Sequence, residues 1–126
     1  MVGIVIVSHS EKLAEGVKDL CRMMTKDVPI EACGGLMDGS FGTDFEKIMA
    51  GVNKVHSEEG TLLLMDMGSA VMTAEMVLEM AGYDNVALVD APVAEGAVAA
   101  AVTSAGGGSL EEVKAEAESA WEMRKL

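Results

Sequence analysis

The sequence predicts an α/β fold with a doubly wound, mainly parallel central sheet flanked by helices. The 126 residues are enough for one core but not for two, so residues 1–126 are expected to form a single domain. Half of the residues are apolar but only 3% are aromatic, so aliphatic side chains and methionines must fill the interior. Short apolar runs alternate with segments of helical periodicity, which is typical of repeated strand–helix–strand units.

Four short runs are interpreted as strands: residues 2–8, 28–33, 61–66 and 86–90. Three of them are almost entirely apolar, as expected for parallel strands that are covered by helices on both faces.

Two helices are predicted from apolar residues that recur every three or four positions between the first three strands. The first apolar stripe consists of Leu13, Val17, Leu20, Cys21 and Met24, and the second of Phe45, Ile48, Met49, Val52 and Val55.

Three further helices are expected. The segment 69–81 is apolar on more than one side, with Met72, Met76 and Met80 in one line, which suggests a subunit interface. The segment 93–105 is rich in Ala and Val and ends at three glycines. The last helix begins at Ser109, which with Glu112 fits a capping box. Its inward side chains are predicted to be Leu110, Val113, Ala117, Ala120 and Trp121.

The chain carries 21 acidic and nine basic side chains, for a formal net charge of −12 at pH 7. This charge argues against binding to nucleic acids and to anionic membranes. Cys21 and Cys33 do not have the spacing of a zinc site or of a disulfide framework, and no metal is expected. The N-terminal segment lacks the basic region of a signal peptide, so the expected location is cytoplasmic.

Chemistry is expected beyond the carboxyl ends of the strands, where open parallel sheets bind their ligands. His9 follows the first strand there. Ser8 and Glu11 fit a capping box, so the amides of the next helix should open toward His9 and favour a phosphoryl group.

Asp66 follows the third strand in the sequence Asp66-Met67-Gly68-Ser69. Aspartate in this position more often caps the next helix, but Ser69 can serve as that cap. Asp66 is then free to accept a hydrogen bond from the imidazole of His9, which would fix the tautomer and leave the other ring nitrogen nucleophilic.

A glycine-rich loop spans residues 34–43, and Thr43 with Glu46 fits a capping box for the second helix. The loop could be a simple connection, or its backbone could approach a ligand closely. It lacks the lysine of a P-loop, which disfavours nucleotide binding by this chain alone. His56, at the end of the second helix, is assigned a structural or solvent role.

Four motifs together resemble the mannose-type EIIA family of the phosphotransferase system, and most closely the members that are phosphotransfer subunits of bacterial dihydroxyacetone kinase. These motifs are GIVIVSHS at 3–10, the glycines and threonine at 34–43, LMDMGSA at 64–70 and DAPVAEGAVAAAV at 90–102. The resemblance implies a sheet order near 2-1-3-4 and a homodimer. It also implies that His9 is the phosphoacceptor and that Asp66 orients its imidazole. The implied phosphoryl pocket consists of Ser10, Gly35, Thr43, Gly68 and Ser69.

The same resemblance implies the partners. Phospho-HPr would donate the phosphoryl group, and ADP bound to the DhaL subunit would accept it, with DhaK downstream and no cofactor on this chain. Two alternatives stay open. The chain could be the EIIA of a mannose-type sugar transporter that phosphorylates a IIB domain, or a receiver-like signalling domain phosphorylated on Asp66. The second alternative would need an acidic pair for Mg²⁺ after the first strand, where this sequence has Ser8-His9-Ser10.

Overall fold

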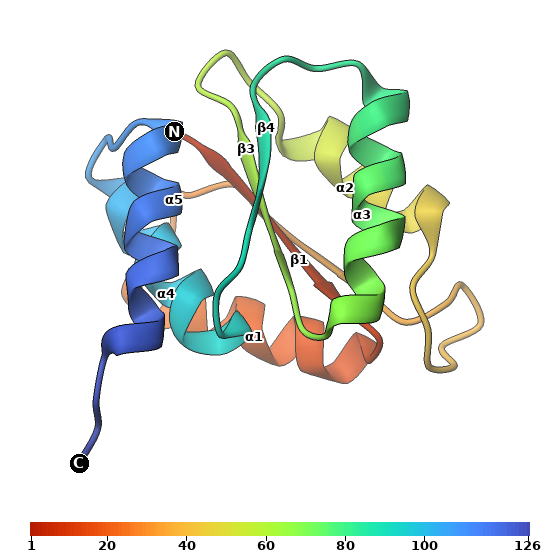
Figure 1. Cartoon of the computed structure of the whole chain (residues 1–126), viewed down its shortest axis with the longest axis horizontal. Coiled ribbons are helices and arrows are strands. Elements are labelled where there is room, and N and C mark those ends of the chain that lie inside the picture. The colour runs from red at the N-terminus through yellow and green to blue at the C-terminus, as the bar shows by residue number, and fades with distance from the viewer.

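The four apolar runs form one parallel sheet in the computed structural model, which describes residues 1–126 (Figure 1). The strands are β1 (Gly3–Ser8), β2 (Ile30–Gly34), β3 (Thr61–Met65) and β4 (Val86–Val89). Their order is β2-β1-β3-β4, and all three pairs are parallel. The predicted fold class and strand order are therefore confirmed.

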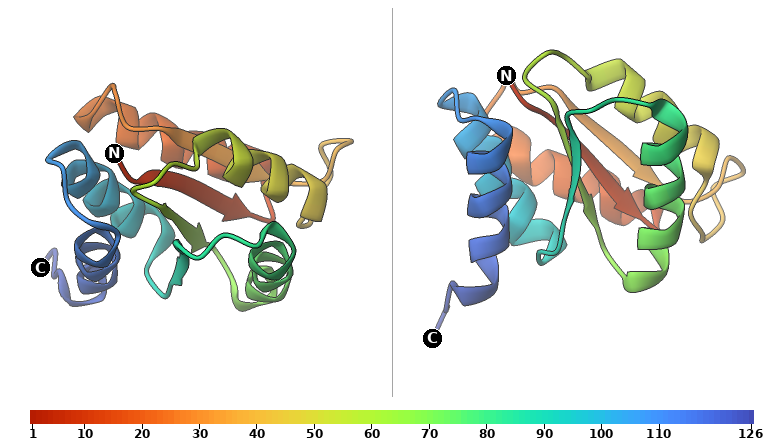
Figure 2. Two further views of the ribbon diagram at one scale, coloured as in Figure 1. Left: turned by 90° about the horizontal axis from the view of Figure 1, so that it is seen from above. Right: turned by 45° about the horizontal axis from the view of Figure 1, so that its top comes forward.

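Helices cover both faces of this sheet, as the nearly continuous apolar strands require. One face packs against α1 (Glu11–Met24), α4 (Val93–Ala105) and α5 (Leu110–Ser119), and the other against α2 (Phe45–Val55) and α3 (Gly68–Ala81). Figure 2 shows α4 and α5 on one side of the strands and α2 and α3 on the other. A short 3₁₀ helix, η1 (Ala120–Glu122), follows α5. None of the helices combines the length and the hydropathy needed to span a bilayer.

The apolar stripe predicted for α1 is partly wrong. Val17 and Cys21 are buried as predicted, together with Ala14, but Leu13, Leu20 and Met24 are 42–60% exposed. The helix lies close to the sheet, since a Cβ on Gly34 of β2 would approach the Cβ of Ala14 to 2.8 Å. Small side chains therefore make this contact, and the larger ones lie at its margins.

The predictions for the last two helices need one correction. Ser109 and Glu112 form the predicted capping box at the start of α5, and Val113 and Ala117 are buried. Trp121, however, is 61% exposed rather than inward. It lies in η1, beyond the end of α5, and its indole N–H donates to the carbonyl oxygen of Asp90.

The helix α3 is apolar on two sides, as the sequence indicates. Ala70, Ala74 and Val77 are buried against the sheet. A second row of large apolar side chains, which we call the α3 methionine row, is more than half exposed: Met72, Met76 and Met80. Exposed apolar side chains at this spacing are typical of a surface that contacts another protein.

Candidate functional site

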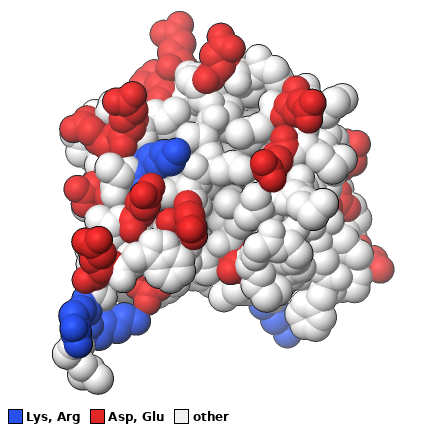
Figure 3. Space-filling view, viewed as in Figure 1, with Lys and Arg blue, Asp and Glu red and all other residues white.

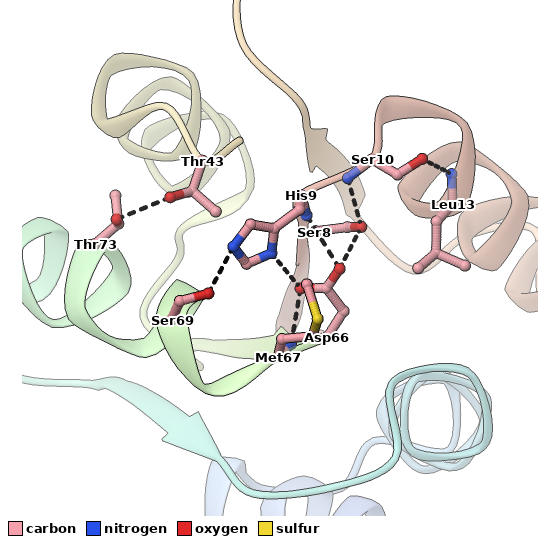
Figure 4. A network of polar contacts seen from close by, with 9 residues as sticks. All are labelled: Ser8, His9, Ser10, Leu13, Thr43, Asp66, Met67, Ser69 and Thr73. Atoms are coloured by element: carbon pink, nitrogen blue, oxygen red, sulfur yellow. Dashed lines mark hydrogen bonds and ion pairs between the residues drawn. The ribbon is translucent and has the colours of Figure 1, made fainter. Parts of the chain in front are cut away.

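The adjacent strands β1 and β3 bring His9 and Asp66 together at the carboxyl edge of the sheet (Figure 4). Asp66 directly follows β3, and its N–H donates to the carbonyl oxygen of Val7 in β1. The chain therefore stays close to β1 until the Asp66 side chain leaves the sheet beside His9.

The imidazole of His9 contacts the carboxylate of Asp66 as the sequence analysis expects. Nδ1 of His9 lies 3.0 Å from Oδ1 of Asp66. A carboxylate only accepts hydrogen bonds, so Nδ1 carries the hydrogen in this contact. In the neutral ring, Nε2 then holds the free lone pair. The His9 side chain is 22% exposed and that of Asp66 only 9%, so the carboxylate lies beneath the ring.

Asp66 accepts three further hydrogen bonds, which fix its orientation. The Ser8 hydroxyl and the His9 N–H donate to Oδ2 over 2.8 and 3.0 Å, and the Met67 N–H donates to Oδ1 over 2.8 Å. Burial tends to raise the pKa of Asp66, but the hydrogen bonds from Ser8, His9 and Met67 together lower this pKa below its ordinary value. The carboxylate is therefore ionised and can stabilise a positive charge on the imidazole.

The other ring nitrogen of His9 points to the start of α3. Nε2 lies 2.7 Å from the Ser69 hydroxyl, which can donate to its lone pair. The N-cap of α3 is Met67, without a side-chain hydrogen bond, so the expectation that Ser69 caps this helix is wrong. Ser69 instead lies in the first turn. The N–H groups of a first turn have no partner within the helix, and a helix N-terminus favours anions.

Of the two serines that flank His9, Ser10 has the capping role that was expected of Ser8. Ser10, not Ser8, is the N-cap of α1 and accepts from the Leu13 N–H over 3.2 Å. The Ser8 side chain is fully buried, and its hydroxyl accepts from the Ser10 N–H over 2.9 Å while donating to Asp66. Ser8 therefore connects the end of β1 to the start of α1.

The glycine-rich loop holds the backbone around His9. The N–H of Gly35 donates to the Ser8 carbonyl oxygen over 3.1 Å, and that of Gly42 donates to the His9 carbonyl oxygen over 2.9 Å. Gly35 and Gly42 have positive φ angles of 71° and 145°, which other residues rarely adopt. The loop thus supports the site through its backbone, and Gly35 makes no hydrogen bond to the imidazole.

Thr43 does not cap the second helix, which corrects a third capping prediction. Asp44 is the N-cap of α2 and accepts from the Lys47 N–H. The Thr43 hydroxyl instead lies 2.9 Å from that of Thr73 in α3. Asp and Thr are both preferred at the N-cap, and here the helix begins one residue later than expected.

The structure therefore groups the predicted site residues into two sets. Asp66 and Ser69 contact the imidazole of His9 directly, and Gly68 begins the helix that carries Ser69. Ser10, Gly35 and Thr43 contact the surrounding backbone or helices. Cys33 takes no part, since its buried thiol contacts the Lys47 carbonyl oxygen, and burial raises its pKa to about 12.

Sequence reasoning missed two polar residues at this edge of the sheet. Lys47 donates to the Gly34 carbonyl oxygen over 2.7 Å and lies 3.4 Å from the Glu11 carboxylate, so it holds the end of β2. Thr73 contacts Thr43. A spacing of four from Ser69 places Thr73 on the same face of α3, and this signal could have identified it.

No three His, Cys, Asp or Glu side chains lie close enough together to share a metal ion. His56 lies elsewhere, at the C-cap of α2. Its ring stacks on Tyr83 with centroids 3.8 Å apart, and its Nδ1 lies 2.8 Å from the Thr61 hydroxyl. These contacts agree with the structural role expected of His56.

Comparison with known proteins shows the family of this chain. The family model described as "PTS system fructose IIA component" (EIIA-man) matches residues 3–114. The chain belongs to the EIIA-man family. His9 and Asp66 both lie within the matched range.

Several curated relatives of this EIIA-man chain are DhaM proteins. The Lactococcus lactis protein described as "PTS-dependent dihydroxyacetone kinase, phosphotransferase subunit DhaM" is 35% identical, with 92% of this chain and 93% of the relative covered. A Listeria innocua DhaM is 37% identical over 82% of this chain and 86% of the relative. The Escherichia coli DhaM is 38% identical over 99% of this chain, but the chain spans only 28% of that longer protein.

Two solved structures have the same fold as this EIIA-man chain. The crystal structure of EF1359, a protein of unknown function, superposes with a TM-score of 0.82 at 34% identity, and covers 94% of each chain. A sigma-54 interaction domain protein from Enterococcus faecalis gives a TM-score of 0.70 at 20% identity, over 96% of this chain and 90% of the other. The second likeness concerns the fold alone.

Proposed function

We propose that this chain is a phosphoryl carrier in which Nε2 of His9 accepts the phosphoryl group. One observation carries the proposal: Asp66 binds Nδ1 at 3.0 Å, which leaves Nε2 facing Ser69 at the N-terminus of α3. A phosphoryl group on Nε2 would lie at a helix end that favours anions. The ionised Asp66 would stabilise the positive ring that forms during transfer.

The transfer needs positioning and charge stabilisation rather than a cofactor. The lone pair of Nε2 attacks phosphorus as the phosphorus–nitrogen bond of the donor phosphohistidine breaks, and the donor histidine keeps that electron pair. Nδ1 of His9 retains its hydrogen and its bond to Asp66. In the second transfer, an oxygen of the acceptor attacks phosphorus, and the bond to Nε2 breaks and restores the neutral ring.

We propose phospho-HPr as the donor and ADP bound to the DhaL subunit as the acceptor, with dihydroxyacetone on DhaK as the final substrate. The names of the DhaM relatives support this assignment, and this chain covers most of the length of two of them. In this role the chain is a phosphotransferase subunit in which residues 1–126 form one phosphotransfer domain.

The uncharged and apolar surface around the start of α3 suits docking of another protein. In the view of Figure 3, acidic side chains gather over α5 and along the upper edge, whereas the surface over the first turns of α3 is largely uncharged. The first residue of the α3 methionine row, Met72, follows Ser69 by three positions in α3 and is exposed. We propose that the chain forms a homodimer, for which exposed apolar side chains on α3 provide contact area.

The EIIA of a sugar transporter is the second candidate, because the matching family is described as a fructose IIA component. Such a protein would use the same His9 but would transfer the phosphoryl group to a IIB domain. Incubation of the phosphorylated chain with DhaL–ADP in one reaction and with a IIB domain in another distinguishes the two. Loss of the phosphoryl group to DhaL–ADP alone is the result that we expect.

The experiment that tests the carrier function mixes the chain with phosphoenolpyruvate, enzyme I and HPr and locates the phosphoryl group by mass spectrometry. We expect one acid-labile phosphoryl group on His9, none in His9→Ala, and normal uptake in the matched control His56→Ala. A base-labile group on Asp66 would instead identify a receiver-like domain. Uptake on His56, or no uptake by the wild type, would refute the proposal.

A further inference from the structure

Thr73 has a hydroxyl group whose position neither helix formation nor core packing explains. Threonine in the middle of a helix usually donates to the carbonyl oxygen four residues earlier. Thr103 in α4 does this, with its hydroxyl 2.9 Å from the Ala99 oxygen. Thr73 is half-buried in α3, like Thr103 in α4, but its hydroxyl contacts the Thr43 hydroxyl 30 residues away in the chain. The Thr43–Thr73 contact is the only hydrogen bond between the glycine-rich loop and α3.

The two hydroxyls lie on the side of the site toward which His9 points. In Figure 4 the imidazole extends from β1 with Nε2 toward α3, between Ser69 on one side and the Thr43–Thr73 pair on the other. Ser69 and Thr73 are one helical turn apart, so their side chains share one face of α3. In this view the hydroxyl groups of Ser69, Thr43 and Thr73 all lie on the side of the ring that carries Nε2.

The Thr43–Thr73 pair has a hydrogen to spare. Two hydroxyl groups carry two hydrogens, and the contact between them uses one. Neither hydroxyl makes a second hydrogen bond in this structure. If Thr73 donates to Thr43, the hydrogen of Thr43 is available to an acceptor in the space beside Nε2. A phosphoryl oxygen is a strong acceptor of this kind, and its hydrogen bonds are charge-assisted.

We propose that Thr73 is a positioning residue that acts through Thr43, an inference that rests on the proposed phosphorylation of His9. The Thr73 hydroxyl donates to Thr43 Oγ1, and this directs the Thr43 hydrogen to an oxygen of the phosphoryl group on Nε2. The same contact holds the glycine-rich loop against α3, so the loop and the helix close around the phosphoryl group together.

The test compares Thr43→Val, Thr73→Val, their double variant and Thr73→Ser, with Thr103→Val as the matched control. Valine keeps the shape of threonine and removes the hydroxyl, whereas serine keeps the hydroxyl. Each protein is phosphorylated from phospho-HPr and, separately, from phosphoramidate, a small donor that needs no docking surface. The rates of uptake and the hydrolysis half-life of the phosphohistidine are measured, together with the melting temperature.

We expect Thr43→Val and Thr73→Val each to slow uptake from both donors about tenfold and to shorten the half-life of the phosphohistidine. The double variant should be no slower than Thr43→Val, because Thr73 acts through Thr43. Thr73→Ser should restore uptake, and Thr103→Val should behave as the wild type. KM for phospho-HPr should not change, which separates this role from docking.

Uptake and half-life that are unchanged in Thr73→Val, while the wild type is phosphorylated on His9, would overturn the inference and leave the carrier function intact. Additive losses in the double variant would also overturn it. Absence of phosphohistidine in the wild type with both donors would overturn the carrier function, and this inference with it.

Discussion

The hydroxyl oxygen of Ser69 lies 2.7 Å from Nε2 of His9, at the atom that we propose as the phosphoryl acceptor. This hydroxyl donates to the neutral ring and must turn away when phosphorus approaches. It can then donate to a phosphoryl oxygen instead. In the proposed function, a single side chain would thus contact the ring both before and after it takes up the phosphoryl group.

Replacement of Ser69 by Ala should slow uptake from phospho-HPr about tenfold, because the phosphoryl group loses one charge-assisted hydrogen bond. The matched control is Ser119→Ala, since the Ser119 hydroxyl donates only to the Glu116 carbonyl oxygen in α5. The rates are measured by quenching the uptake reaction at successive times and determining the phosphorylated fraction by mass spectrometry. An unchanged rate in Ser69→Ala would show that this hydroxyl has no part in transfer.

Asp66→Asn should retain the attachment site on His9 but slow transfer, because the amide carries no charge to stabilise the positive ring. We expect a loss of about tenfold to a thousandfold, comparable to removal of one electrostatic group from an active site. Uptake kinetics of Asp66→Asn and the wild type measure it. Equal kinetics would refute the orienting role of Asp66.

The pH dependence of stability gives a second test of Asp66. Its pKa in the folded protein lies below the ordinary value, because the hydrogen bonds outweigh the effect of burial. The stabilisation from its charge is therefore fully present above the unfolded-state pKa of about 3.9 and is lost as the pH falls through the lower folded-state pKa. The difference in melting temperature between the wild type and Asp66→Asn should be constant near neutral pH and shrink below about pH 4. A constant difference down to pH 2 would contradict this assignment.

Gly34, at the contact between β2 and α1, and Gly16, on the exposed side of α1, should respond to alanine in opposite ways. A Cβ on Gly34 would collide with the Ser10 carbonyl oxygen and lie 2.8 Å from the Ala14 Cβ. Gly34→Ala should destabilise the protein by about 1–3 kcal/mol and slow phosphoryl uptake, since it displaces the start of α1. A Cβ on Gly16 would meet no atom within 4 Å beyond the nearby backbone of its own helix. Gly16→Ala should therefore stabilise α1 by about 0.5–1 kcal/mol, because alanine favours the helix more than glycine does. Urea denaturation measures both changes, and destabilisation by Gly16→Ala would contradict the packing described here.

Both cysteines should be unreactive in the folded protein. Burial raises the pKa of Cys21 to about 11 and that of Cys33 to about 12, so at pH 8 roughly a thousandth or less of either thiol is ionised. A disulfide reagent should label neither thiol at neutral pH until urea unfolds the chain, after which both should react. Rapid labelling of one thiol in native protein would show local opening around it.

The sequence was sufficient to predict the strands, the helices and the His9–Asp66 contact. Apolar runs as short as residues 61–65 are unambiguous when helical periodicity follows, and parallel strands must end at one edge. The cap of α5 was predicted correctly, but those of α1 and α2 were not predictable, because neighbouring residues such as Ser8 and Ser10, or Thr43 and Asp44, satisfy the same preference. The choice depends on the residue at which the strand or loop ends, and this is set by contacts with the rest of the fold.

The burial of individual side chains was also only partly predictable. In α1 the periodicity identifies the correct face, but the closeness of Gly34 and Ala14 is a property of two segments that are 20 residues apart. The large side chains Leu13 and Leu20 therefore lie at the margin of the apolar face that was predicted from them. Thr73 escaped notice for a similar reason, since its partner Thr43 comes from another element.

The exposed indole of Trp121 offers a practical benefit. It is the single tryptophan of the chain, and it borders a groove of about 510 Å³ that Asp66 also lines. Its N–H is attached to the backbone of Asp90, so the ring is held at this rim of the molecule rather than free in solvent. The protein thus contains an intrinsic fluorophore near the edge of the sheet that carries His9 and Asp66. Binding of a partner at this edge can be followed by the change in tryptophan fluorescence, without any added dye.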